Sequence, residues 1–169
     1  DALPISYTVM ITGLKGGHSG EDIHRGHGNA NSLLGRFMAE AGKRFTYGIS
    51  AVKGGTYRLA IPREARADLS LAASDYGKLV QLTEELQAVF REELQQTSSL
   101  LKITVEEIPL AGTQVSPDKI VTLLLLAPDG ICQMNEVLTG LVDTSDNLGE
   151  LHMDGREFRM VFEIRSAQD

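Results

Sequence analysis

The amino-acid sequence predicts an α+β domain, a two-layer structure in which helices pack on one face of a mainly antiparallel sheet. Segments with strand periodicity and segments with helix periodicity are interleaved along the 169 residues. The strand segments alternate apolar and polar residues, whereas the strands of a doubly wound parallel sheet are continuously apolar. Hydrophobic residues make up 42% of the chain, enough for one domain with its own core or for a tight pair of small ones.

The first part of the chain predicts a strand, a glycine-rich loop and a helix. Residues 5–12 alternate apolar and polar side chains, which is typical of a half-buried strand. The glycine-rich loop follows over residues 13–28. We expect a helix to begin near Asn29 and to end at Gly42, because apolar residues form one helical stripe between them. The stripe consists of Leu33, Leu34, Phe37, Met38 and Ala41.

The middle of the chain predicts further strands and the longest helix. Residues 44–52 have the composition of a strand, and Gly54-Gly55 then predicts a tight turn into a strand-like run at 57–61, which Pro62 interrupts. Residues 65–71 alternate again and predict another one-sided strand. The longest helix follows, with apolar residues three and four positions apart. These residues are Leu79, Leu82, Leu86, Val89 or Phe90, and Leu94.

The last part of the chain predicts a short strand, a helix and a hairpin. The strand covers 101–105, and the helix starts at 116–118, where a serine can cap it, a proline fits its first turn and an aspartate lies near the positive end of its dipole. The hairpin has arms over about 139–152 and 158–164, with its turn at 154–155. Its second arm is expected to direct inward Phe158, Met160, Phe162 and Ile164.

Composition excludes several classes of partner. Acidic residues outnumber basic ones 23 to 16, giving a net charge of −7 without any block of Lys and Arg, which argues against nucleic acid or an anionic membrane as a partner. Cys132 is the single cysteine, so an internal disulfide and a cysteine-rich zinc module are excluded and a reducing compartment is indicated. No apolar run approaches the ~20 residues of a membrane-spanning helix.

Three histidines lie in or just after the glycine-rich loop: His18, His24 and His27. Their spacing matches no common set of metal ligands, so we interpret them as polar loop residues of which one or two have another function. The glycine spacing also differs from a dinucleotide-binding fingerprint. His18 stands apart because glycines flank it on both sides, so that backbone could approach a ligand closely while the imidazole points into a cleft.

Other reactive side chains have ordinary structural interpretations. His152 and Asp154 form a His-x-Asp motif, but Asp154 belongs to the predicted hairpin turn. Cys132 has no neighbouring histidine or basic residue that would activate it as a nucleophile. Three glutamate pairs are best explained as surface charge, at 84–85, 92–93 and 106–107. The residues alone therefore supply no complete catalytic set.

Four sequence blocks resemble the bacterial aminoacyl-histidine dipeptidases, also called Xaa-His or cytosol non-specific dipeptidases. The most specific block is G-L-K-G-G-H-S-G-x-x-I-H-x-G-x-G-N-A-N at residues 13–31. The other blocks follow in order: G-G-T-Y-R-L-A-I-P-R-E-A at 54–65, T-S-D-N-L-G at 144–149, and I-R-S at 164–166. These dipeptidases are zinc exopeptidases of the type that includes aminoacylase, carnosinase and glutamate carboxypeptidase.

The resemblance implies that residues 1–169 are the lid, or dimerisation, domain of such an enzyme. The chain begins at Asp1 without a methionine and ends just after a strand-like run, so we expect a segment of a longer protein. The two zinc ions, their ligands and the general-base glutamate belong to the family's catalytic domain, so the fragment is expected to bind no metal and to be inactive alone. The resemblance also implies a cytoplasmic homodimer, joined through the lid, that hydrolyses dipeptides.

The resemblance assigns roles to three positions. His18 would reach the partner subunit's active site and stabilise the oxyanion of the tetrahedral intermediate or hold the substrate carboxylate. Arg165 is similar to the family's arginine that grips the C-terminal carboxylate of the peptide. Leu59 stands where the family has a substrate-binding asparagine, so either recognition is altered or another polar group substitutes. We interpret Arg58 and Arg63 as strand-edge charges.

An alternative interpretation stays open at this stage. The chain could be a non-catalytic α+β module, for dimerisation or for ligand binding, that keeps the family fold without peptidase activity. Leu59 is the residue that keeps this alternative open, because a leucine side chain cannot donate a hydrogen bond.

Overall fold

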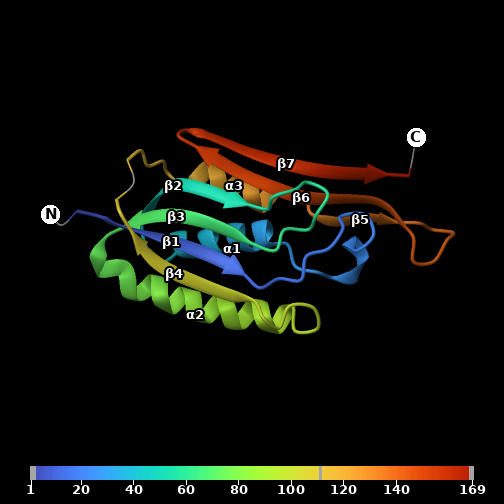
Figure 1. Cartoon of the computed structure of the whole chain (residues 1–169), viewed down its shortest axis with the longest axis horizontal. Coiled ribbons are helices and arrows are strands. Elements are labelled where there is room, and N and C mark those ends of the chain that lie inside the picture. The colour runs from blue at the N-terminus through green and yellow to red at the C-terminus, as the bar shows by residue number, and fades with distance from the viewer. Residues whose placement is uncertain (1–2, 111, 168–169) are drawn as a thin grey trace.

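The computed structural model describes residues 3–110 and 112–167, and within them seven strands form one antiparallel sheet that three α-helices cover (Figure 1). This confirms the predicted α+β class. The strands are β1 (Ile5–Thr12), β2 (Tyr47–Gly54), β3 (Ala65–Leu71), β4 (Lys102–Ile108), β5 (Gly130–Met134), β6 (Val142–Asp154) and β7 (Glu157–Ser166). The helices are α1 (Ala30–Gly42), α2 (Tyr76–Glu93) and α3 (Asp118–Leu126), with short 3-10 turns η1 (Ile23–Arg25) and η2 (Ala73–Asp75).

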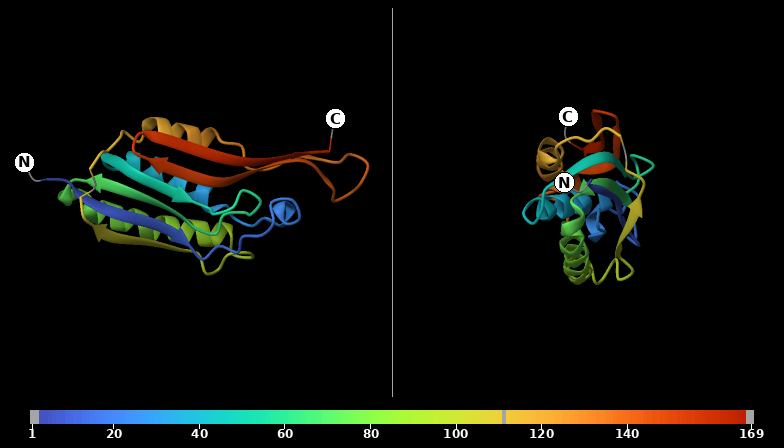
Figure 2. Two further views of the ribbon diagram at one scale, coloured as in Figure 1. Left: turned by 45° about the horizontal axis from the view of Figure 1, so that its top comes forward. Right: turned by 90° about the vertical axis from the view of Figure 1, so that its left-hand side faces the viewer.

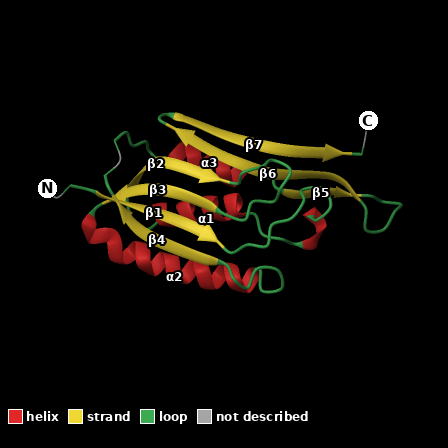
Figure 3. Ribbon diagram, viewed as in Figure 1, coloured by secondary structure: helices red, strands yellow, loops and turns green. Residues whose placement is uncertain are grey.

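The strands are ordered β4-β1-β3-β2-β6-β5 (Figure 3). Strand β2 pairs with residues 151–153 of β6 and β5 pairs with residues 142–146, whereas β7 pairs with β6 along its whole length. The register of β1 against β3 places Val9 opposite Ala67 and Ile11 opposite Ala65, and all four side chains are buried. This one-sided burial is what the alternation in both segments predicts. The long β6–β7 hairpin extends past the ends of β1, β2, β3 and β4, and β5 pairs with its projecting part (Figure 2, left).

Helix α1 lies under the centre of the sheet, where it contacts β1, β2, β3 and β6 and both other helices. In the end-on view, the helices gather on one side of the molecule and the strands on the other (Figure 2, right). The predicted start of α1 is confirmed, because the Oδ1 of Asn29 accepts hydrogen bonds from the amides of Asn31 (2.9 Å) and Ser32 (3.3 Å). In α2, Phe90 is fully buried whereas Val89 is 40% exposed, which settles the apolar stripe of that helix.

Some details differ from the predictions. Residues 57–61 form a loop in which only Ala60 makes a β-bridge, with His18, because this segment packs on β6 and on the glycine-rich loop instead of beside a strand. Strand β5 was not predicted, since four of its five residues are exposed and show no alternation. Ile164 is 67% exposed, contrary to prediction, because it pairs with Asp146 in the part of the β6–β7 hairpin that lies beyond the pairing of β6 with β2.

Candidate functional site

Three segments far apart in sequence meet at the glycine-rich loop. The amide of Ser19 donates to the carbonyl of Leu59 (2.9 Å), and the amide of Ile61 donates to the carbonyl of Gly17 (2.8 Å). A Cβ atom on Gly20 would lie 2.7 Å from Cζ of Arg165, so the guanidinium group of Arg165 lies directly against this glycine. The structure therefore brings the segments that carry His18, Leu59 and Arg165 into one neighbourhood.

The imidazole of His18 is held by the backbone that follows it. Its Nδ1 accepts hydrogen bonds from the amides of Gly20 (3.1 Å) and Glu21 (3.2 Å). A ring nitrogen that accepts is unprotonated, so in the neutral ring the proton lies on Nε2. This assignment follows from the hydrogen bonds and leaves Nε2–H as a donor on an exposed side chain.

The carboxylate of Asp22 fixes the backbone of the same loop. Its Oδ2 accepts from the amide of His18 (2.8 Å), and its Oδ1 lies 3.2 Å from Nε of Arg25. The hydrogen bond from His18 lowers the pKa of Asp22 below its ordinary value, against the opposing effect of partial desolvation, and the charge of Arg25 lowers it further. The backbone that carries the His18 ring is therefore held in place by the Asp22 carboxylate.

Arg165 lies on β7 between the loop and an acidic neighbour. Its Nη2 is 3.8 Å from Oε1 of Glu163, and Oε2 of Glu163 is 3.3 Å from Nε of Arg58. The Nε of Arg165 is buried and has no hydrogen-bond partner among the described residues. A guanidinium group with an unpartnered N–H donor suits a carboxylate ligand. Arg58 lies in a turn and not in a strand, and its exposed side chain shares Glu163 with Arg165.

The remaining reactive side chains do not join this site. Nδ1 of His27 is bonded to the carbonyl of Gly16, His24 is exposed, and Nε2 of His152 is bonded to Glu150 (2.8 Å). Within residues 3–110 and 112–167, no three or more His, Cys, Asp or Glu side chains are grouped so that they could hold a metal ion.

Cys132 is exposed, and its Sγ donates to Oδ2 of Asp146 (3.1 Å). This hydrogen bond to a carboxylate raises the pKa of the thiol, and desolvation adds to the effect, so the reactive thiolate is disfavoured. The arrangement agrees with the interpretation that Cys132 is not a nucleophile.

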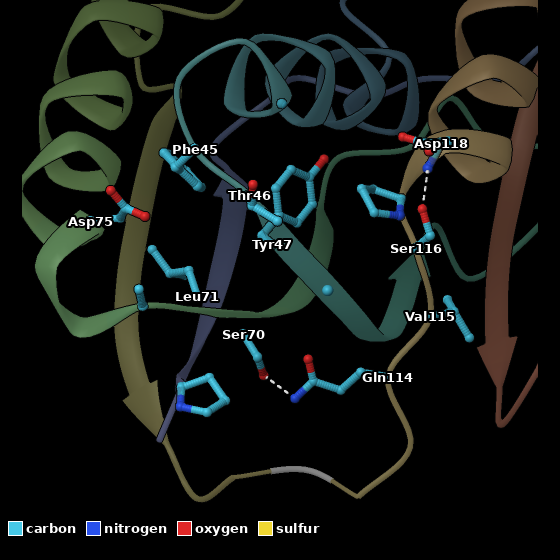
Figure 4. A pocket seen from close by; sticks show the side chains of 15 residues that line it. Phe45, Thr46, Tyr47, Ser70, Leu71, Asp75, Gln114, Val115, Ser116 and Asp118 are labelled. Carbon is cyan, nitrogen blue, oxygen red and sulfur yellow. Dashed lines mark hydrogen bonds between the residues drawn. The ribbon is translucent and has the colours of Figure 1, made fainter. Parts of the chain in front are cut away.

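A hollow of about 660 Å³ lies at the opposite end of the sheet from His18, where β2 begins and β3 ends (Figure 4). Phe45, Tyr47 and Leu71 line it, together with Gln114, whose Nε2 donates to Oγ of Ser70 (2.5 Å). The hollow contains none of the three predicted site residues. None of the helices formed by the described residues has the length and apolar character that crossing a membrane requires.

Comparison with known proteins gives consistent relatives. Residues 9–98 match the family described as "Peptidase dimerisation domain". The chain is 35% identical to the cytosol non-specific dipeptidase of Escherichia coli (strain K12) over 97% of its own length and 34% of that protein. It matches the crystal structure of aminoacylhistidine dipeptidase from Vibrio alginolyticus with a TM-score of 0.94 and 33% identity, over 100% of this chain and 35% of that one. The chain therefore spans about a third of the length of these relatives.

Proposed function

Because the chain belongs to the peptidase dimerisation domain family, we propose that it serves as the lid and dimerisation domain of a dipeptidase. Within that enzyme it lends His18 and Arg165 to the binding of a dipeptide, of the Xaa-His type. The resemblance of the 13–31 block and the relatives at 35% and 33% identity support this reading over a non-catalytic module.

The observation that carries the proposal is the orientation of the His18 ring. Two backbone amides hold Nδ1 as an acceptor, so Nε2–H is a donor whose direction is set before substrate arrives. Peptide hydrolysis develops negative charge on the carbonyl oxygen, and an oriented donor stabilises that charge more in the transition state than in the ground state. His18 can perform this role without gaining or losing a proton.

Arg165 is proposed to bind the C-terminal carboxylate of the dipeptide. Its guanidinium group lies against Gly20, two residues from His18 in sequence, and 3.8 Å from Oε1 of Glu163. Leu59 is apolar at the position where the resemblance implies a hydrogen-bonding asparagine, so carboxylate recognition would depend more heavily on Arg165. Arg58, which shares Glu163 with Arg165, is the polar side chain nearest in sequence to take over that contact.

The zinc ions and the assembly belong to the proposal for the longer enzyme. As the resemblance implies, two zinc ions would be bound by a catalytic domain outside this chain and would supply the Lewis-acid chemistry there. The enzyme would act in the cytoplasm as a homodimer joined through the lid, with His18 reaching the partner subunit's active site. The isolated domain would be inactive.

The test is a zinc-dependent dipeptidase assay on the full-length enzyme. His18→Ala removes the oriented donor and is expected to lower kcat by ~10² to 10³, the usual effect of losing an oxyanion donor. His24→Ala is the matched control, because His24 is an exposed histidine of the same segment, and its kcat should be unchanged. An unchanged kcat in His18→Ala would refute the role, and absence of zinc-dependent activity in the full-length enzyme would favour the non-catalytic module.

A further inference from the structure

One buried side chain of β6 is bonded to the loop that carries Leu59. The Nδ2 of Asn147 donates to the carbonyls of Arg58 and Ala60, both at 2.9 Å, so the two acceptors flank Leu59. Asn147 is 1% exposed, and its Oδ1 has no hydrogen-bond partner among the described residues. The amide group therefore acts through its two N–H donors alone.

The backbone of β6 beside Asn147 is also in direct contact with this loop. A Cβ atom on Gly149 would lie 2.6 Å from Cα of Arg58, and a Cβ atom on Gly55 would lie 1.9 Å from the carbonyl oxygen of Gly149. Gly55 has φ of 66°, a conformation that favours glycine. Because the backbone of residues 55–60 contacts the backbone of β6 with no side chain between them, this loop has a fixed position on β6.

The same loop in turn holds the backbone around His18. The carbonyl of Leu59 accepts from Ser19 (2.9 Å), the amide of Ile61 donates to Gly17 (2.8 Å), and His18 pairs with Ala60 as an isolated bridge. These bonds lie on both sides of His18 in sequence. Its ring is therefore anchored, through one intermediate loop, to a buried amide on β6.

From this chain of contacts we propose that Asn147 is a positioning residue that fixes the place of His18 through residues 57–61. The inference rests on the proposed function, in which the Nε2–H of His18 donates to the reacting carbonyl. Without the Asn147 amide, the part-buried carbonyls of Arg58 and Ala60 each lose a donor, and the loop moves to find others. A shift of about 1 Å at a catalytic donor can cost ~10² in rate.

Two substitutions in the full-length enzyme separate the donors from the volume of the side chain. Asn147→Ala removes the N–H donors and the side-chain volume together. Asn147→Asp keeps the shape of the side chain but replaces the N–H donors with a carboxylate oxygen that faces the two carbonyls. Both are expected to lower kcat by ~10- to 100-fold with a smaller change in KM. Glu150→Gln is the control, because Glu150 lies on the same strand and its side chain is bonded to His152, and its kcat should be unchanged.

A double-mutant cycle tests whether Asn147 acts through His18. If it does, Asn147→Ala added to His18→Ala should cost less than ~3-fold further in kcat, since the positioned group is already absent. Multiplication of the two single losses would overturn the proposal, as would an unchanged kcat in Asn147→Ala.

Hydrogen exchange supplies a readout that does not depend on activity. In Asn147→Ala, amides in peptides covering 17–19 and 59–61 should exchange at least ~10-fold faster than in Glu150→Gln, with the helices unchanged. Unchanged exchange would overturn the proposal. If His18→Ala itself left kcat unchanged, the proposed function would fail, whereas the exchange result would still decide whether Asn147 fixes the loop.

Discussion

Asn29 joins the N-terminus of α1 to the β6 strand, and its replacement is a sensitive test of this fold. The side chain is 6% exposed and serves four partners. Its Oδ1 caps the helix at the amides of Asn31 and Ser32, while its Nδ2 donates to Oδ1 of Asp129 (2.9 Å) and to the carbonyl of Leu148 (3.1 Å). Asn29→Ala removes all four contacts and leaves a small void.

The expected cost follows from these contacts. Loss of a helix N-cap costs about 1 kcal/mol, and loss of a hydrogen bond to a charged group costs about 1.5 kcal/mol or more. The carbonyl of Leu148 keeps a second donor, Nδ2 of Asn31 (3.1 Å), so loss of its hydrogen bond from Asn29 adds little to the cost. Asn29→Ala should therefore reduce the free energy of unfolding by roughly 2–3 kcal/mol, measured by urea denaturation with far-UV circular dichroism.

Asn29→Asp is the informative companion. It keeps the capping oxygen but places a second carboxylate against Asp129, whose pKa is already raised by desolvation. An acid with a raised folded-state pKa favours folding most when it is protonated, so this variant should be less destabilised at pH 4 than at pH 7. A loss below about 1 kcal/mol for the alanine variant, or no pH dependence for the aspartate variant, would refute the reasoning.

Three further outcomes are expected. The pKa of Asp22 is lowered in the folded state, so its hydrogen bond with the His18 amide is present above the ordinary pKa of 3.8 and is lost as the pH falls through the lower folded-state pKa. In a pH titration, the amide resonance of His18 should therefore shift with a midpoint below pH 3.8, and a higher midpoint would contradict this. Gly149→Ala should lower the free energy of unfolding by about 1–3 kcal/mol in urea, because its Cβ would meet backbone, whereas Gly77→Ala in α2 should raise it; equal effects would argue against the contact. In the full-length enzyme, Leu59→Asn should lower KM for a dipeptide in a steady-state assay, and an unchanged KM would show that this position does not bind substrate.

The sequence predicted the elements whose structure is determined by local periodicity. Alternation predicted β1 and β3, and the apolar stripe predicted α1 with its start near Asn29, because burial of one face follows directly from such patterns. Residues 57–61 resisted prediction, since their backbone hydrogen bonds are made by Asn147 and by the glycine-rich loop, both distant in sequence. No window of local sequence contains those partners.

The candidate site was predictable only in part. The resemblance selected His18 and Arg165, and their roles stay predictions, but the sequence contained no sign that Gly20 makes room for the guanidinium group. Glu163 and Asn147 were missed as supporting residues. The available signal for Asn147 was a run of polar residues, 143–147, inside a strand, where buried polar side chains need partners and therefore indicate a specific network.

The central claim is that His18 of one subunit serves the active site of the other. It is tested most directly by mixing two inactive full-length variants under conditions of subunit exchange: His18→Ala, and a variant disabled in its zinc ligands. In a mixed dimer, the subunit with intact zinc ligands receives the partner's intact histidine, so dipeptidase activity should appear that neither variant shows alone. If His18 acts within its own subunit, the mixture stays inactive, and that result would contradict the account.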